Sequence, residues 1–117
     1  MRLTGRPITK KNNRSFVRGN RGGFTIASPR YRQYEEDCLW QLKQYKEKHT
    51  GPMSIKIVFE MKGKLDSDLD NMVTSILDVL QKAEVIDDDK NVMALDAQKY
   101  RGFKDWVTHI EIKKQQR

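Results

Sequence analysis

Two adjoining segments constrain the fold of this chain more than any other part of its sequence. From Met53 to Met61, apolar and polar residues alternate, which predicts a half-buried β-strand. Farther on, apolar residues recur at intervals of three and four and predict a helix over roughly Asp70–Ala83. The apolar stripe consists of Leu69, Met72, Val73, Ile76, Leu77 and Leu80. The outer face would carry Asn71, Thr74, Ser75, Asp78 and Lys82.

A second helix is expected to begin at Pro29. Ser28 suits the N-cap position, and Pro29 suits the first helical position. The residues that then recur at helical spacing are Tyr31, Tyr34, Cys38, Leu42 and Tyr45. This spacing predicts core packing rather than base stacking. The sequence Thr50-Gly51-Pro52 predicts the end of the helix.

The remaining apolar segments predict strands. Val92–Lys99 and Trp106–Lys113 are expected to pair as a hairpin, with a turn over Arg101–Lys104. Two short strands are expected near Arg6–Thr9 and Phe24–Ala27. One face of the last strand would carry Trp106, Thr108, Ile110 and Ile112, and both Trp40 and Trp106 are expected to pack. This order predicts an α+β domain with a small mixed β-sheet and two main helices.

The length of 117 residues indicates one domain, 1–117. A formal net charge of +7 and a pI near 9.6 favour a polyanionic partner, above all nucleic acid. Nine basic and no acidic residues fall within residues 1–34, so residues 1–27 are expected to form a basic, loop-rich arm. There Arg14, Arg18 and Arg21 would meet DNA phosphates, unless the arm is only a solvated terminus. Residues 113–117 predict a frayed polar tail.

The single cysteine, Cys38, leaves the sequence without a pair for an internal disulfide, which fits a reducing, intracellular setting. No apolar run approaches membrane-spanning length, and the N-terminus lacks the apolar segment of a signal peptide. We therefore expect a cytoplasmic protein with no membrane partner. His49 and His109 lack the neighbours of a zinc site and are expected to be ordinary surface residues.

Nine of the sixteen acidic residues lie between Asp66 and Asp96, inside an otherwise basic chain. A metal-dependent nuclease needs this combination, because carboxylates hold a divalent cation while Lys and Arg hold the phosphates. Asp68 and Asp70 are two residues apart, so both carboxylates can reach one ion. Asp89 follows a helix whose ends are about 20 Å apart, so it joins them only if the chain returns along the helix. The alternative is a solvated acidic loop, and Asp66 and Asp87 are expected to be solvated flanks.

Three motifs have counterparts in a known family. Asp68-Leu69-Asp70-Asn71-Met72 and the later Asp88-Asp89-Lys90-Asn91-Val92 resemble the D-L-D-N-[LM] and D-D-x-x-[VI] motifs of the RusA family of Holliday-junction resolvases. The N-terminal Pro7-Ile8-Thr9-Lys10-Lys11-Asn12-Asn13 is similar to the family's P-x-[ST]-x-x-N opening. Lys99 falls where the family often has a lysine. The resemblance covers nearly the whole chain.

This resemblance implies a homodimer that binds four-way junction DNA and nicks two opposing strands in DNA recombination and repair. It also implies a Mg²⁺ ion, with Mn²⁺ as a substitute, held by Asp68, Asp70 and Asp89, with Asp88 as the alternative third ligand. The metal would activate a water molecule for phosphodiester hydrolysis. The candidate catalytic residues are Asp68, Asp70, Asp89 and Lys99. The candidate DNA-binding residues are Lys10, Lys11, Asn12, Asn13, Arg14, Arg18 and Arg21.

Thr74 departs from the family pattern, which usually has a lysine four residues after the second Asp of D-L-D-N. A Thr hydroxyl cannot bring positive charge to a scissile phosphate, so Lys99, or else Arg14 or Lys11, would have to replace that lysine. The alternative hypothesis is a junction-binding protein with weak or no nuclease activity. A third hypothesis, a DxD phosphoryl- or glycosyltransferase, is disfavoured because the chain lacks a Gly-rich phosphate loop.

Overall fold

The computed structural model describes residues 1–8, 14–19, 22–64 and 66–115. The strands are β1 (Arg2–Thr4), β2 (Arg14–Gly19), β3 (Gly22–Ala27), β4 (Met53–Lys62), β5 (Val92–Phe103) and β6 (Val107–Lys114). The helices are α1 (Pro29–Leu42), α2 (Leu69–Lys82) and the short 3-10 helix η1 (Asp89–Asn91). Two main helices and a mixed sheet confirm the predicted α+β architecture. No helix among the described residues has the length and apolarity needed to cross a membrane.

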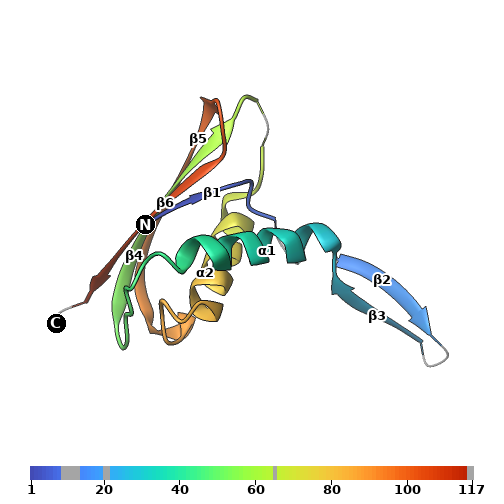
Figure 1. The fold of residues 1–117 in the computed structure, drawn as a ribbon, viewed down its shortest axis with the longest axis horizontal. Helices are drawn as coiled ribbons and strands as arrows, with labels where there is room; N and C mark the ends of the chain where they lie inside the picture. Colours follow the sequence, from blue (N-terminus) through green and yellow to red (C-terminus); the bar gives the residue numbers. More distant parts are fainter. Residues whose placement is uncertain (9–13, 20–21, 65, 116–117) are drawn as a thin grey trace.

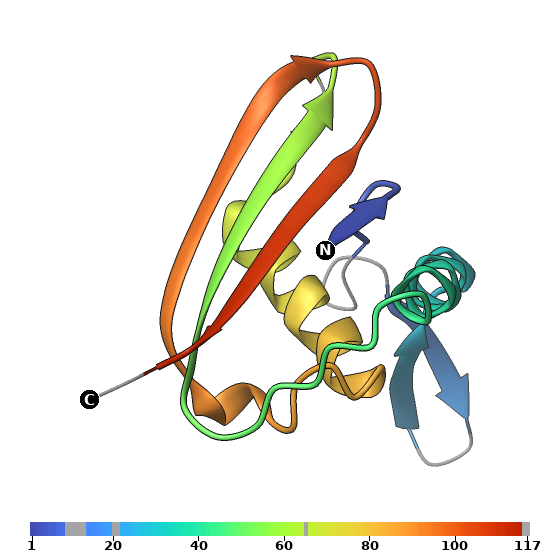
Figure 2. The same ribbon diagram turned by 60° about the vertical axis from the view of Figure 1, so that its left-hand side comes forward.

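The main sheet has four strands in the order β1-β6-β4-β5. Strand β4 pairs in parallel with β5 and antiparallel with β6. Parallel neighbours need a crossover connection, and α2 provides it. Both main helices lie on the same side of the sheet (Figure 1, Figure 2). The loop entering α2 therefore lies at the carboxyl edge of β4 and β5, whereas the chain leaving α2 reaches the opposite edge.

Strands β2 and β3 form a separate two-stranded hairpin. It extends from the start of α1, away from the main sheet (Figure 1). The strand expected near Phe24–Ala27 is confirmed within β3, but residues 14–19 form a strand where a loop was expected. The sequence signal for this hairpin was the concentration of Gly and Asn residues from Gly19 to Gly23, because such residues favour turns between strands.

The core lies between the sheet and the helices, as the periodicities predict. All five residues of the alternating β4 face are buried: Met53, Ile55, Ile57, Phe59 and Met61. Helix α1 contributes Tyr31, Tyr34, Cys38 and Leu42, and α2 contributes Met72, Val73, Ile76, Val79 and Leu80. Burial raises the pKa of the Cys38 thiol to about 11. The predicted shared face of β6, Trp106, Thr108, Ile110 and Ile112, is also buried.

Phe59→Ala is expected to lower the free energy of unfolding by about 3–5 kcal/mol. Phe59 is fully buried on the central strand, so its loss leaves a cavity that the paired neighbours cannot close. Lys56→Ala on the exposed face of the same strand is the matched control, with an expected change within about 0.5 kcal/mol. Urea denaturation measures both changes. Similar losses from the two variants would contradict the placement of the core.

The predicted hairpin between β5 and β6 is wrong. The two strands are not neighbours, because β4 lies between them. The α2 crossover places β5 against one edge of β4, and β6 then pairs with the other edge. The short connection from β5 to β6, residues 104–106, therefore lies past the end of β4, near which the Gly63 N–H donates to the Phe103 carbonyl (3.0 Å).

The first strand and the C-terminal residues also differ from expectation. Strand β1 spans Arg2–Thr4 rather than Arg6–Thr9, because Gly5 has a positive φ of 112° and Pro7 lacks an N–H donor. Leu3 is buried, so these first residues belong to the main sheet. Lys113 and Lys114, expected in a frayed tail, pair with β4. Residues 116–117 lie outside the described residues.

Helix α1 ends at Leu42, eight residues before the predicted stop. Only Tyr45 continues its buried stripe, and the Tyr45 hydroxyl accepts a hydrogen bond from the Arg2 backbone N–H (3.1 Å). After the helix the chain runs beside residues 85–87, where the His49 N–H donates to the Val85 carbonyl (2.8 Å). The prediction that Trp40 packs is wrong: its side chain is 72% exposed, and the Lys43 ammonium lies 4.9 Å from the ring centroid.

Candidate active site

Asp68 and Asp70 lie at the start of α2, at the carboxyl edge of the parallel strands. Asp68 is the N-cap residue, yet its carboxylate makes no capping hydrogen bond to the helix backbone. Its Oδ2 instead accepts a hydrogen bond from the Asn71 side-chain amide (3.3 Å). Both aspartates are exposed. N-cap aspartates usually accept from backbone N–H groups, so this carboxylate is held where it can bind another group.

The first turns of α2 are anchored by polar residues that face the protein interior. Asn71 and Ser75 are buried, which corrects the expectation that both lie on the outer face. The Ser75 hydroxyl donates to the Ile8 carbonyl (2.8 Å) and ties the N-terminal segment to the helix. The hydrogen bonds of these two side chains fix the position of the helix start, and so of the aspartates on it.

Asp66, two residues before Asp68, forms ion pairs with two cationic side chains. Its Oδ1 accepts from the Lys99 ammonium (2.9 Å), and its Oδ2 accepts from the Arg101 guanidinium. The hydrogen bond from Lys99, with further help from the Ser67 N–H and the charge of Arg101, holds the pKa of Asp66 below its usual value. Asp66 is exposed, as expected of a solvated flank, but its carboxylate also forms ion pairs with Lys99 and Arg101.

Two further contacts hold the same loop. Lys99 also donates to the Ser67 carbonyl (2.9 Å). The Arg6 guanidinium donates to the Asp66 carbonyl (3.3 Å) and approaches the Ser67 hydroxyl (3.5 Å). Arg6 lies 5.2 Å from the ring centroid of Trp106, which is buried as expected. Sequence reasoning did not find Arg6 and Arg101, although the two-residue spacing of Lys99 and Arg101 on β5 was a usable signal.

Thr74 lies one turn after Asp70 and is exposed. Its hydroxyl donates to the Asp70 carbonyl (3.0 Å). This local bond occupies the hydroxyl within the helix and brings no positive charge to the site. Among the described residues, Arg6, Lys99 and Arg101 bring positive charge to the Asp66–Ser67 loop, which precedes Asp68.

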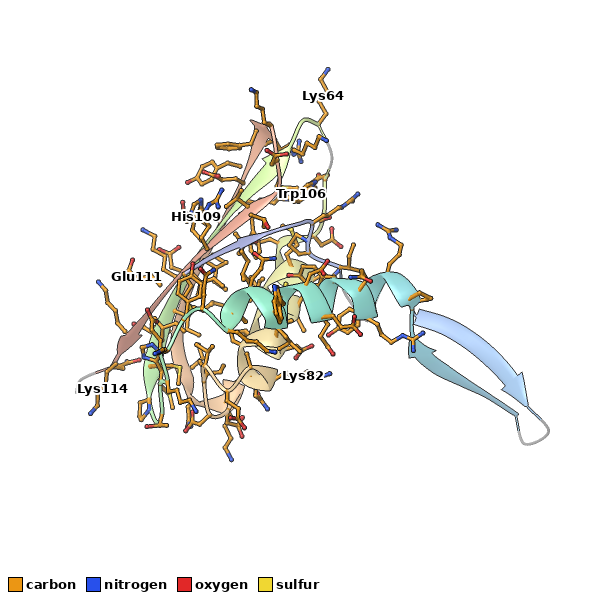
Figure 3. The ribbon with its side chains drawn as sticks, in the orientation of Figure 1. Lys64, Lys82, Trp106, His109, Glu111 and Lys114 are labelled. Atoms are coloured by element: carbon orange, nitrogen blue, oxygen red, sulfur yellow. The ribbon has the colours of Figure 1, made fainter. Side chains whose placement is uncertain are left out.

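Asp89 lies at the other end of α2, as the crossover requires. Its backbone N–H donates to Gln81 Oε1 near the end of α2 (3.0 Å), not to the loop before Asp68. In Figure 3, Lys64, shortly before α2, and Lys82, its last residue, lie at opposite ends of this segment. Among the described residues, no three His, Cys, Asp or Glu side chains are grouped so that they could hold a metal ion.

The three successive aspartates after α2 have different surroundings. Asp87 Oδ2 accepts from the Gly51 N–H (3.1 Å) and the Asn91 side chain (3.0 Å), which lower its pKa. Asp87 is exposed, as expected of a solvated flank, and its carboxylate also anchors the loop. Asp88 caps η1 by accepting from the Lys90 N–H (3.0 Å). No described residue donates a hydrogen bond to the Asp89 carboxylate, which leaves that group free for a ligand.

The expected DNA-binding residues belong to the N-terminal segment and the hairpin. Arg14 and Arg18 are positions of β2, whose backbone pairs with β3. Lys10, Lys11, Asn12, Asn13 and Arg21 lie outside the described residues. His49 and His109 lie near the surface, where each ring meets one carboxylate, that of Glu47 (3.1 Å) and that of Glu60 (3.2 Å).

Comparison with known proteins gives a consistent result. The family model for endodeoxyribonuclease RusA matches residues 4–113. The crossover junction endodeoxyribonuclease RusA of Aquifex aeolicus is 32% identical over 85 residues. That alignment covers 71% of this chain and 65% of the relative, so the match spans about two thirds of the relative's length. The family match covers both acidic motifs and the strands around them, and the chain belongs to the RusA endodeoxyribonuclease family.

Proposed function

We propose that this protein is a metal-dependent endodeoxyribonuclease that resolves four-way DNA junctions by paired nicks, in DNA recombination and repair. The observation that carries the proposal is the exposed pair Asp68 and Asp70 beside a loop bound by three cationic side chains. Such a site offers carboxylates for a divalent cation and positive charge for the phosphate group. The family of the chain and its net charge of +7 support the same proposal.

The donor set at the start of α2 suits Mg²⁺, with Mn²⁺ as a substitute. Mg²⁺ keeps several waters and is commonly bound by one or two carboxylates together with substrate phosphates. Asp68 supplies an N-cap carboxylate that is not used for capping, and Asn71 holds one of its oxygens. A bound ion would lower the pKa of a water molecule and stabilise the charge that develops on the phosphate.

Asp89 completes this site only from a second copy of the chain. Helix α2 has 14 residues and is about 21 Å long, so Asp89 of the same chain lies too far from Asp68 to share an ion. A two-fold axis across α2 would place the start of one helix near the end of the other. We therefore propose a homodimer with two equivalent sites, which also accounts for paired symmetric nicks. Asp89 is preferred to Asp88, whose carboxylate caps η1.

The positive charge of the missing family lysine is supplied, in this proposal, by Lys99 and its neighbour Arg101 on β5. Both reach the loop next to Asp68 from the same strand. The β2–β3 hairpin, with Arg14 and Arg18, extends away from the sheet and would contact the arms of the junction (Figure 1). Lys10, Lys11, Asn12, Asn13 and Arg21 complete the proposed DNA-binding residues.

The proposal is tested by incubating the protein with a labelled four-way junction and with linear duplex of the same sequence, each with and without Mg²⁺. We expect metal-dependent cleavage of the junction and little cleavage of the duplex. Equal cleavage of both DNAs would contradict junction specificity. Failure to bind the junction at low salt would overturn the proposal as a whole.

A second candidate function is junction binding with weak or no cleavage, and Thr74 is the observation that favours it. Its hydroxyl is bonded to the Asp70 carbonyl and supplies no charge (3.0 Å). If this view holds, Thr74→Lys will raise the nicking rate about tenfold or more from a near-zero starting value. If Lys99 and Arg101 already replace the lysine, the rate will change less than threefold. Thr74→Gln, a matched uncharged variant, separates the effect of charge from that of side-chain length.

A further inference from the structure

The cationic side chains around the loop before Asp68 bring more positive charge than is needed to hold that loop in place. Arg6, Lys99 and Arg101 come from two distant parts of the chain and all contact Asp66 or Ser67. Among the described residues of this loop, Asp66 is the carboxylate that pairs with them directly. Asp68 and Asp70 follow two and four residues after Asp66, at the start of α2, so a metal ion bound to them would leave this part of the surface with net positive charge. Such a surface attracts a phosphate group.

The two cations on β5 are held in different ways. Lys99 bridges the Asp66 carboxylate and the Ser67 carbonyl, both at 2.9 Å, and its side chain is 29% exposed. Arg101 contacts the same carboxylate through a single Nη2, and its side chain is 55% exposed. A guanidinium has five N–H donors, so among the described residues most donors of Arg101 are left for solvent or a ligand.

We propose that Arg101 is a phosphate-binding residue of this site. Asp66 holds its guanidinium in place in the absence of DNA and gives way to a DNA phosphate, while Lys99 acts as a positioning residue for the loop. The inference rests on the proposed function, because it presumes that DNA enters this site. It adds residues that neither acidic motif contains.

The chemistry of the groups supports this division. Guanidinium groups bind phosphate through two parallel N–H···O bonds, so a phosphate can compete with one carboxylate oxygen. Exposed ion pairs such as Asp66–Arg101 contribute little to stability, and their exchange for a phosphate is therefore easy. Lys99 would lose a backbone contact as well as an ion pair if it turned toward DNA, so it stays with the loop.

The first test measures junction binding without divalent metal, over a range of salt concentrations. Each phosphate contact contributes about 0.9 to the slope of log K against log salt concentration. Arg101→Gln is expected to reduce that slope by about 0.9, the value of one phosphate contact, whereas Lys99→Gln, which removes charge but no direct phosphate contact, should reduce it by less than half as much. Lys104→Gln, an exposed cation in the next turn, is the control for general charge loss and should change the slope by less than half as much.

The second test asks whether Asp66→Asn strengthens or weakens junction binding. If a phosphate displaces Asp66 from Arg101, this variant will bind the junction about twofold to fivefold more tightly, because no ion pair has to be broken. The gain will disappear when Arg101→Gln is also present. Asp105→Asn removes an equal charge from the exposed turn after β5 and controls for the overall change in charge.

The outcomes separate this inference from the proposed function. Unchanged salt slope in Arg101→Gln, or weaker binding in Asp66→Asn, would overturn the role of Arg101. If Lys99→Gln lowered the salt slope as much as Arg101→Gln does, the separate roles proposed for Arg101 and Lys99 would be overturned. A wild-type protein that does not bind junctions would overturn the proposed function itself.

Discussion

Asp70→Asn is expected to lower the rate of Mg²⁺-dependent junction nicking by about a thousandfold or more. The variant removes one of two carboxylates that lie together at the start of α2, and a charged ligand contributes several kcal/mol through the metal it holds. Asn keeps the shape of the side chain but not its charge. Single-turnover cleavage of a labelled junction measures the effect.

The same variant should remain folded and should still bind DNA. Asp70 is exposed in the first helical turn, where its charge interacts favourably with the helix dipole and stabilises the helix by about 0.3–1 kcal/mol. We therefore expect a decrease of only a few degrees in Tm and unchanged or slightly tighter junction binding without metal. Asp78→Asn, farther along α2, is a carboxylate control away from the site. Retained nicking in Asp70→Asn would contradict the assignment of the metal site.

Mixed dimers of Asp70→Asn and Asp89→Asn subunits are expected to regain nicking that both parent homodimers lack. If each site combines Asp68 and Asp70 of one subunit with Asp89 of the other, the mixed dimer has one intact site and one doubly altered site. It should nick one strand at up to about half the wild-type rate, a gain of about a hundredfold or more over either parent. Tandem affinity tags isolate the mixed dimer for the assay.

The control for this experiment pairs Asp68→Asn with Asp70→Asn subunits. Both residues belong to the same half of the proposed site, so every site in this mixed dimer carries one altered ligand, and it should stay inactive. Activity in neither mixture would contradict a site that is shared between subunits. Activity in both mixtures would contradict the placement of Asp68 and Asp70 in the same half of the site.

Local periodicity predicted the elements that pack against each other. The alternation of β4 gives its buried residues correctly, and the apolar stripe of α2 gives Met72, Val73, Ile76 and Leu80, because burial forces these patterns on a strand and a helix. The stripe did not predict the burial of Val79, Asn71 and Ser75. The pairing of β5 with β4 was not predicted, because strand order depends on contacts distant in sequence. The end of α1 was misplaced because the Tyr45 side chain packs beside β1 without being helical.

The position of Asp68 and Asp70 at the start of α2 was predicted because the two residues are close in sequence and precede a clear helix. Their role as metal ligands stays a prediction. The separation of Asp89 from them follows from the length of α2 and the crossover between parallel strands. Arg6 and Arg101 were missed because their meeting at Asp66 depends on the tertiary fold. The role of Asp66 as their acceptor was missed for the same reason.

Mapping the cleavage sites on a four-way junction at nucleotide resolution is the decisive experiment for the proposed nuclease. We expect two nicks at equivalent positions of opposing strands, only with Mg²⁺ or Mn²⁺, with ends that a ligase can rejoin. Asp70→Asn should produce neither nick. A junction that is bound but stays intact at every metal concentration would contradict the proposed nuclease and leave junction binding as the function.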